Sequence, residues 1–247
     1  MDHHIVASIS ITGTCFDVLG SLYLAYDLLG GQHGPLRLLT RVVTYSLVFG
    51  IGYGLGLGLI FGLASGIATG VTLAVEFNRE ARGLEHYSLP WEGLFSAIRG
   101  FAFGAGLYKI LGLRFAMAFA ILITIGQVFA YSRGLRPGME YSASRRPRFT
   151  RRQFWGTVMR TVGYIVTALV CSALIRHVDH VWAFALRVGL VTGIVTGVGA
   201  TINPYIEYYA ENLPERRLGV FGIGLILCGF ALQSVQYWLA LFDVRLS

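Results

Sequence analysis

The chain of 247 residues is 55% hydrophobic and only 13% charged, whereas charged residues make up about 25% of a soluble globular domain. This composition excludes an ordinary soluble enzyme and predicts an all-α, polytopic transmembrane helix bundle surrounded by the lipid bilayer. The net charge of +7 comes from 20 basic and 13 acidic residues, and 19 of the basic residues are arginines, mostly clustered next to long uncharged stretches. Such clustering indicates a membrane surface and no nucleic-acid partner.

The predicted helices follow from stretches of roughly 20 apolar residues, the length that crosses the hydrocarbon core of a bilayer. These stretches cover residues 5–29, 42–75, 93–110, 115–131, 156–175, 181–202 and 218–241. All six prolines fall between the stretches or at their ends, which supports these boundaries. The first stretch lacks the positive flank and the small-residue cleavage site of a signal peptide, so we expect it to remain in the protein.

The second stretch decides the number of spans, because its 34 uncharged residues are long for one helix and short for two. The segment 133–152 contains seven arginines and one acidic residue, Glu140, and is therefore expected on the cytoplasmic side. One crossing from residue 42 to residue 75 would leave Arg37 and Arg41 outside, whereas a hairpin would keep them inside. The charges thus predict a hairpin and eight spans, with seven as the alternative.

A short internal repeat also favours eight spans. Residues 66–71 read GIATGV and residues 193–198 read GIVTGV, so the two copies differ at one position and are 127 residues apart. Each copy precedes an acidic, aromatic-containing linker, a Leu-Pro pair and another apolar span. We interpret the chain as two tandem four-span halves, with an N-terminal half at 1–131, an arginine-rich cytoplasmic linker at 132–154 and a C-terminal half at 155–247.

Glycines recur at every fourth position in two of the predicted helices. They are Gly50, Gly54, Gly58, Gly62, Gly66 and Gly70 in the first row and Gly189, Gly193 and Gly197 in the second. A row of this kind leaves a groove on one helix face that lets another backbone approach closely, so both rows are predicted to be helix-packing faces. Glycines lining a narrow pore are the alternative.

A polar stripe on the first predicted helix contains the sharpest candidate for a functional site. Ser10, Thr14, Asp17 and Ser21 follow helical spacing, with the carboxylate near the middle of the span. An ionisable group at this depth is a candidate proton or cation site facing a cavity. The structural alternative is an ion pair with an arginine of another span, for which the candidates are Arg99, Arg160 and Arg187. Asp27 lies near the helix end and can reach the interface.

Other acids, histidines and cysteines give weaker signals. Five glutamates lie one helical turn apart just beyond the glycine-rich spans: Glu76, Glu80, Glu207, Glu211 and Glu215. They could bind a divalent cation, but a solvated face of an interfacial helix is the favoured interpretation. His177 and His180 flank Asp179 without a third ligand, so no metal site is predicted. Cys15, Cys171 and Cys228 lie in apolar stretches, and we expect neither a disulfide nor zinc.

The sequence contains no catalytic motif, so no catalytic residue is assigned and the residue pattern identifies no cofactor. The favoured function is a non-catalytic membrane subunit that packs with other subunits or with itself to form or anchor a larger assembly. A small secondary transporter or channel with Asp17 as its ion or proton site comes second. A membrane enzyme acting on lipid or isoprenoid substrates comes third. The expected location is an inner or plasma membrane of the bacterial type, with residues 133–152 cytoplasmic.

Overall fold

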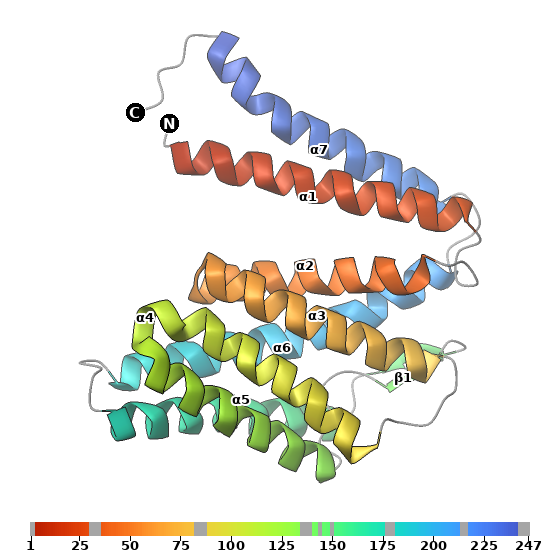
Figure 1. Cartoon of the computed structure of the whole chain (residues 1–247). Helices are drawn as coiled ribbons and strands as arrows, with labels where there is room; N and C mark the ends of the chain where they lie inside the picture. Colours follow the sequence, from red (N-terminus) through yellow and green to blue (C-terminus); the bar gives the residue numbers. More distant parts are fainter. Residues whose placement is uncertain are drawn as a thin grey trace. The chain divides into compact units, whose positions relative to one another are not determined.

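The computed structural model describes residues 3–29, 36–81, 88–133, 140–142, 145–148, 151–175, 181–212 and 217–241. The elements in chain order (Figure 1) are α1 (His3–Leu28), α2 (Arg37–Leu57), α3 (Leu59–Ala81), α4 (Leu89–Ser132), β1 (Glu140–Ser142), β2 (Arg145–Arg148), α5 (Arg151–Ile175), α6 (Val181–Asn212) and α7 (Arg217–Leu241). Within these ranges, seven helices are long and apolar enough to cross a membrane. The predicted helical membrane protein is therefore supported, and the two strands are a short antiparallel hairpin within the arginine-rich segment.

The chain divides into two compact units. One unit contains residues 1–40 together with 209–247, and the other contains residues 41–208. This division brings both ends of the chain into one unit and differs from the consecutive halves predicted above, which stay a prediction.

The smaller unit consists mainly of α1 and α7, which lie side by side. A methyl group on Gly13 would come within 2.7 Å of the Gly229 carbonyl oxygen, and one on Gly222 would come within 2.7 Å of the Gly20 carbonyl oxygen. Residue numbers rise along α1 while their partners fall along α7, so the two helices run antiparallel. Their backbones approach closely because glycine has no side chain to keep them apart.

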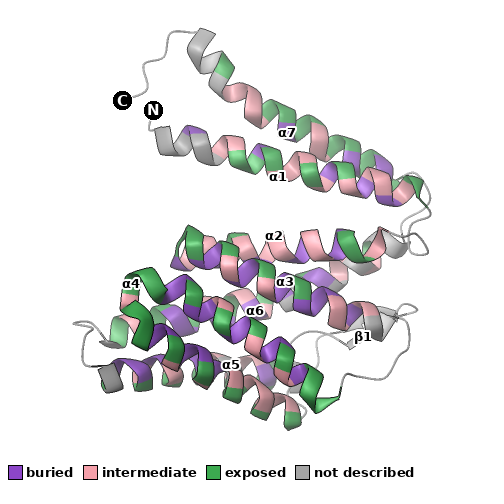
Figure 2. Ribbon diagram, viewed as in Figure 1, coloured by how far each residue is buried: buried purple, intermediate pink, exposed green. Residues whose placement is uncertain are grey.

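The larger unit contains an aromatic core. Tyr53, Phe61 and Phe103 are almost fully buried, and the rings of Phe61 and Phe103 stack with their centroids 5.5 Å apart. The Tyr53 ring meets both phenylalanine rings edge-on. In α3 and α4, buried residues alternate with exposed apolar residues at helical spacing (Figure 2), so each helix has an inner face and an apolar outer face suited to lipid.

The stretch 42–75 folds as a helical hairpin, as the loop charges predicted. The turn between α2 and α3 is at Gly58, whose φ of +99° suits glycine and few other residues. Each arm reaches 21 or 23 residues because the charged residues at its outer end are also helical. Gly58 was predicted to be a packing glycine, but it forms the turn instead, and nothing lies within 4 Å of the position its Cβ would occupy.

The other glycines of the first row lie where α2 and α3 face each other. A methyl group on Gly62 would lie 2.6 Å from the Gly50 carbonyl oxygen and 2.6 Å from the Gly54 Cα. A methyl group on Gly66 would collide with the Gly50 backbone, and one on Gly70 would collide with Ser46. The glycine run thus folds back on itself, so that its first half faces its second half.

Helix α4, with 44 residues, is a second hairpin. Gly112 is non-helical, with φ 80° and ψ 169°, and separates a first arm (89–111) from a second arm (113–132). A methyl group on Gly104 would lie 2.5 Å from the Ala116 carbonyl oxygen, and one on Gly100 would lie 2.7 Å from that of Ala120. These contacts place the arms antiparallel and side by side (Figure 1).

Helix α2 packs against α6 as well as α3. A methyl group on Gly52 would lie 2.8 Å from Val195, and Gly56 faces Val191 in the same way. The Tyr53 hydroxyl is 3.2 Å from the hydroxyl of Thr196. Both copies of the short repeat, in α3 and in α6, therefore lie against α2. In turn, Gly189, Gly193 and Gly197 of α6 face Ile165, Thr161 and Thr157 of α5.

Candidate functional site

Arg99 forms the centre of a buried polar cluster in the larger unit. It is the eleventh residue of α4, so its Cα lies about 15 Å along the helix from Leu89, and the residue is only 8% exposed. The side chains of helical residues point toward the helix N-terminus. This direction brings the guanidinium toward Glu92, two turns earlier, where Nη2 donates a 2.8 Å hydrogen bond to Oε1 of Glu92.

The guanidinium also contacts a second carboxylate, on α3. Its Nη1 donates to Oε1 of Glu76 at 3.2 Å and to the hydroxyl of Thr72 at 3.4 Å. Glu92 is buried, accepts a further hydrogen bond from the Ser96 hydroxyl at 3.4 Å and lies in the first turn of α4, where the helix dipole favours a negative charge. The cluster thus joins one cation to two carboxylates across α3 and the first arm of α4.

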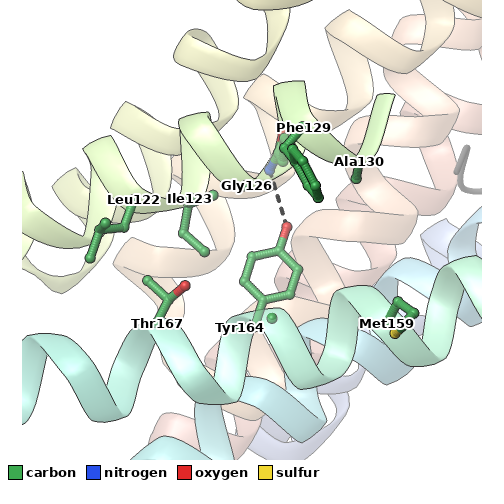
Figure 3. A pocket seen from close by; sticks show the side chains of 10 residues that line it. Leu122, Ile123, Gly126, Phe129, Ala130, Met159, Tyr164 and Thr167 are labelled. Atoms are coloured by element: carbon green, nitrogen blue, oxygen red, sulfur yellow. Dashed lines mark hydrogen bonds between the residues drawn. The ribbon is translucent and has the colours of Figure 1, made fainter. Parts of the chain in front are cut away.

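An amide and a phenol extend the cluster to two further helical segments. Arg99 Nε donates to Oε1 of Gln127 on the second arm of α4 at 3.1 Å. Gln127 Nε2 in turn donates to the Tyr164 hydroxyl on α5 at 3.1 Å, the bond drawn in Figure 3. A single arginine is therefore linked, directly or through one residue, to α3, both arms of α4 and α5.

The arrangement favours holding helices together over performing chemistry. Arginine has five N–H donors in a rigid fork and keeps its charge in proteins, and here all three of its nitrogens contact acceptors on other residues. Removing a charge from water is costly unless it is paired and hydrogen-bonded. Both conditions are met at Arg99, so its charge is neutralised locally.

A pocket adjoins the polar cluster between α5 and the second arm of α4. Its volume is about 280 Å³, and Figure 3 shows its apolar lining, with Leu122 and Ile123 toward one end and Met159 and Phe129 toward the other. The only amide and phenol in this lining are Gln127 and Tyr164. The lining is thus mostly hydrocarbon, with the Thr167 hydroxyl and a polar wall of Gln127 and Tyr164 that is linked to Arg99.

In the smaller unit, the polar stripe of α1 faces α7 at Asp17. Gln233 Nε2 donates to Oδ2 of Asp17 at 2.6 Å and contacts the Thr14 hydroxyl at 3.3 Å. The other carboxylate oxygen, Oδ1, is buried without a hydrogen-bond partner and lies where a side chain on Gly229 would be. Thr14 also donates to the Ser10 carbonyl oxygen, and Ser21 is exposed.

The arginines proposed as partners of Asp17 have other contacts. Arg99 binds the two glutamates, and the exposed Arg187 donates from Nε to the Gly56 carbonyl oxygen at 3.0 Å. The side chain of Arg160 is outside the described part of the structure. Asp27 lies near the end of α1, where its carboxylate would be 2.8 Å from a methyl group on Gly219.

Most of the weaker candidates from the sequence also lie outside the described residues or side chains. They are Glu80, Glu207, Glu211, Glu215, His177, Asp179 and His180. Among the residues that are described, no group of three or more His, Cys, Asp or Glu side chains could hold a metal ion. The described cysteines Cys15, Cys171 and Cys228 are free thiols.

Sequence reasoning missed how Glu92, Gln127 and Tyr164 relate to Arg99. The contact between Arg99 and Glu92 could have been predicted, because residues seven positions apart lie on the same face of a helix. The relation to Gln127 had none, since it depends on the turn at Gly112. Comparison of the chain with known protein families, curated proteins and solved structures gives no match.

Proposed function

We propose that this protein is a non-catalytic integral membrane subunit, which crosses the bilayer eight times and forms or anchors a larger membrane assembly. Eight crossings follow when the two arms of α4 are counted separately, since each arm has 20 residues or more and the turn at Gly112 reverses the chain. The glycine rows are proposed as the packing faces of this bundle, in keeping with the close backbone approaches at Gly62 and Gly66.

The contacts of the buried Arg99 side chain are the observation that supports this proposal best. The guanidinium of Arg99 donates its hydrogen bonds to side chains of α3 and of both arms of α4. A transport or catalytic site instead needs charged groups that face a water-filled path or a substrate. The outer faces of the helices are rich in exposed apolar side chains such as Leu55, Ile110 and Phe129. Such surfaces contact lipid or other membrane helices.

The experiment is gentle extraction from the source membrane, followed by size measurement and protein mass spectrometry. A subunit is expected to elute as an oligomer or with a partner chain in fixed ratio. A homogeneous monomer, obtained both in mild detergent and in lipid nanodiscs, would contradict the proposal. An unrelated membrane protein of similar size, extracted from the same membrane in parallel, controls for partners that bind detergent micelles.

A small secondary transporter or channel is the second candidate, because the Oδ1 atom of Asp17 is buried without a hydrogen-bond partner. A carboxylate oxygen of this kind can take up a proton or a cation. In proteoliposomes, Asp17→Asn should then abolish ion or proton flux while the protein stays folded, with a helical content near that of the parent. Absence of flux in the parent protein would rule out this candidate.

A further inference from the structure

The pocket between α5 and the second arm of α4 owes its space to two glycines. Gly126 and Gly163 both line it, and a methyl group at either position would meet nothing within 4 Å. Most other glycines in the described helices face a backbone or side chain closely. At Gly126 and Gly163 the missing side chains therefore create a hollow, with no helix approaching to fill it.

The hollow is on the outer surface of the helices. Phe129 and Met159, at its rim, are 58% and 59% exposed, and both belong to helices that are long and apolar enough to cross a membrane. A molecule entering this hollow therefore comes from the lipid phase. The lining is almost entirely apolar, so it suits a hydrocarbon tail.

The polar wall indicates what the other end of this molecule is. Gln127 is oriented by Arg99, because only its amide oxygen can accept the arginine N–H, and this directs its NH₂ group toward Tyr164. An amide nitrogen has two hydrogens, and one of them goes to the Tyr164 hydroxyl. The other is a donor suited to a carbonyl oxygen in the pocket.

The charges next to the wall favour a neutral head group. The positive charge of Arg99 is already balanced by Glu76 and Glu92, so no net positive charge is left to attract a phosphate or a carboxylate. Two carboxylates beside one guanidinium instead oppose an anionic ligand.

We propose that this pocket binds a neutral lipid-soluble molecule with a carbonyl-bearing head and a hydrocarbon tail, its carbonyl oxygen accepting a hydrogen bond from Gln127. Quinones with alkyl or prenyl tails and uncharged acyl esters share this chemistry. This proposal rests on the membrane location of the chain. It does not depend on whether the protein is a subunit of a larger assembly.

The test measures the melting temperature of the purified, delipidated protein in detergent with three probes added separately. The probes are decylbenzoquinone, dioctanoylglycerol and decylbenzene, the last of which has a ring and a tail but no carbonyl. Because a ligand that binds the folded state raises its stability, the quinone, the glyceride or both should raise the melting temperature, and the responding probe identifies the source. Decylbenzene should have no effect.

Matched variants connect the response to the pocket. Gly163→Leu places a side chain in the hollow from α5, where its Cβ would meet nothing within 4 Å, and Gly224→Leu on α7 is the control, since its Cβ would also meet open space. The first variant should weaken probe binding at least tenfold and the second should leave it unchanged. Gly126→Leu serves the same purpose from α4 if Gly163→Leu does not fold.

Three results would overturn the proposal. The first is an equal response to decylbenzene, which would show an apolar hollow without carbonyl recognition. The second is no response to any probe. The third is an undiminished response in folded Gly163→Leu or Gly126→Leu protein. Gln127→Glu, which keeps an oxygen for Arg99 but removes the amide donor, should lower the affinity for the carbonyl probe at least tenfold.

Discussion

At the residue scale, Arg99 shows how a membrane helix can contain a full charge. A lone arginine at the centre of a bilayer-spanning helix is costly, and so is each of the two glutamates beside it. Together the three charged groups pair with one another, and Gln127 accepts a hydrogen bond from the guanidinium Nε. The stability of the cluster therefore depends on its being complete, since removing one member leaves the others at membrane depth without a partner.

We expect Arg99→Met to lower the free energy of unfolding by about 3–5 kcal/mol, the usual result of removing one partner from a buried ion pair. The triple variant Arg99→Met, Glu76→Gln, Glu92→Gln should recover much of this loss, because it leaves no uncompensated charge. Unfolding in mixed detergent micelles measures both. Arg187→Met is the control, since Arg187 is exposed and bonds one backbone carbonyl; an Arg99 variant as stable as this control would contradict the interpretation.

Asp17 and Asp27 allow a second prediction at this scale. Asp17 accepts a short hydrogen bond from Gln233, and a bond to an ionised group is about twice as strong as one between neutral groups. Asp17→Asn should therefore cost about 1 kcal/mol of stability, while Asp27→Asn, near the helix end, should change it by less than about 0.5 kcal/mol. Thermal melting of both variants compares them, and equal effects would refute the ordering.

At the element scale, glycine has two opposite roles in this chain. At Gly62 and Gly66 the missing side chain leaves room for a neighbouring backbone, while at Gly58 and Gly112 glycine provides a positive φ where the helix reverses. The spacing of the first row is unbroken from residue 50 to residue 70, so spacing alone does not distinguish the turn from the packing positions. The loop charges of Arg37 and Arg41 predicted a hairpin, but they did not locate its turn at Gly58.

The element scale also shows where sequence reasoning stops. The apolar middle of each helix and the hairpin of α2 and α3 could be predicted, because hydropathy and charge are local properties of the chain. The helix ends could not, since several helices continue into polar flanks: α6 ends at Asn212, ten residues beyond the predicted stretch 181–202. The link from Arg99 to Gln127 could not, since it spans 28 positions and requires the turn at Gly112. The packing of α1 on α7 was not predicted for a similar reason. Gly13 lies close to Gly229 and Gly20 lies close to Gly222, and these contacts depend on which helix is the neighbour.

Leucine at Gly62 or at Gly193 should destabilise the protein by about 3 kcal/mol or more, at the upper end of the cost of overpacking. The Cβ at Gly62 would lie 2.6 Å from the Gly54 backbone, which cannot move aside as a side chain can, and Gly193 faces Thr161 closely. Detergent melting of each variant measures the loss. The control is Gly224→Leu, whose Cβ meets open space, and a loss of the same size in that variant would mean that leucine is harmful at any glycine.

At the scale of the whole molecule, the two ends of the chain lie in the same compact unit. Helices α1 and α7 form one compact unit although almost the entire chain separates them. Nothing local in the sequence predicts this pairing, because each helix has an ordinary apolar composition. An even number of crossings is required if the outer ends of α1 and α7, His3 and Leu241, lie at the same membrane face, as their antiparallel packing indicates.

The last prediction concerns this topology. Eight crossings put residues 2 and 247 on one side of the membrane and the arginine-rich segment 133–152 on the other, the cytoplasmic side. In a background with Cys15, Cys171 and Cys228 replaced by serine, single cysteines in place of Asp2, Ala143 and Ser247 can be labelled in intact cells with an impermeant maleimide. Positions 2 and 247 should react from outside, and position 143 should react only after the membrane is permeabilised. Labelling of position 143 in intact cells would reverse the orientation, and different results for positions 2 and 247 would exclude an even number of crossings.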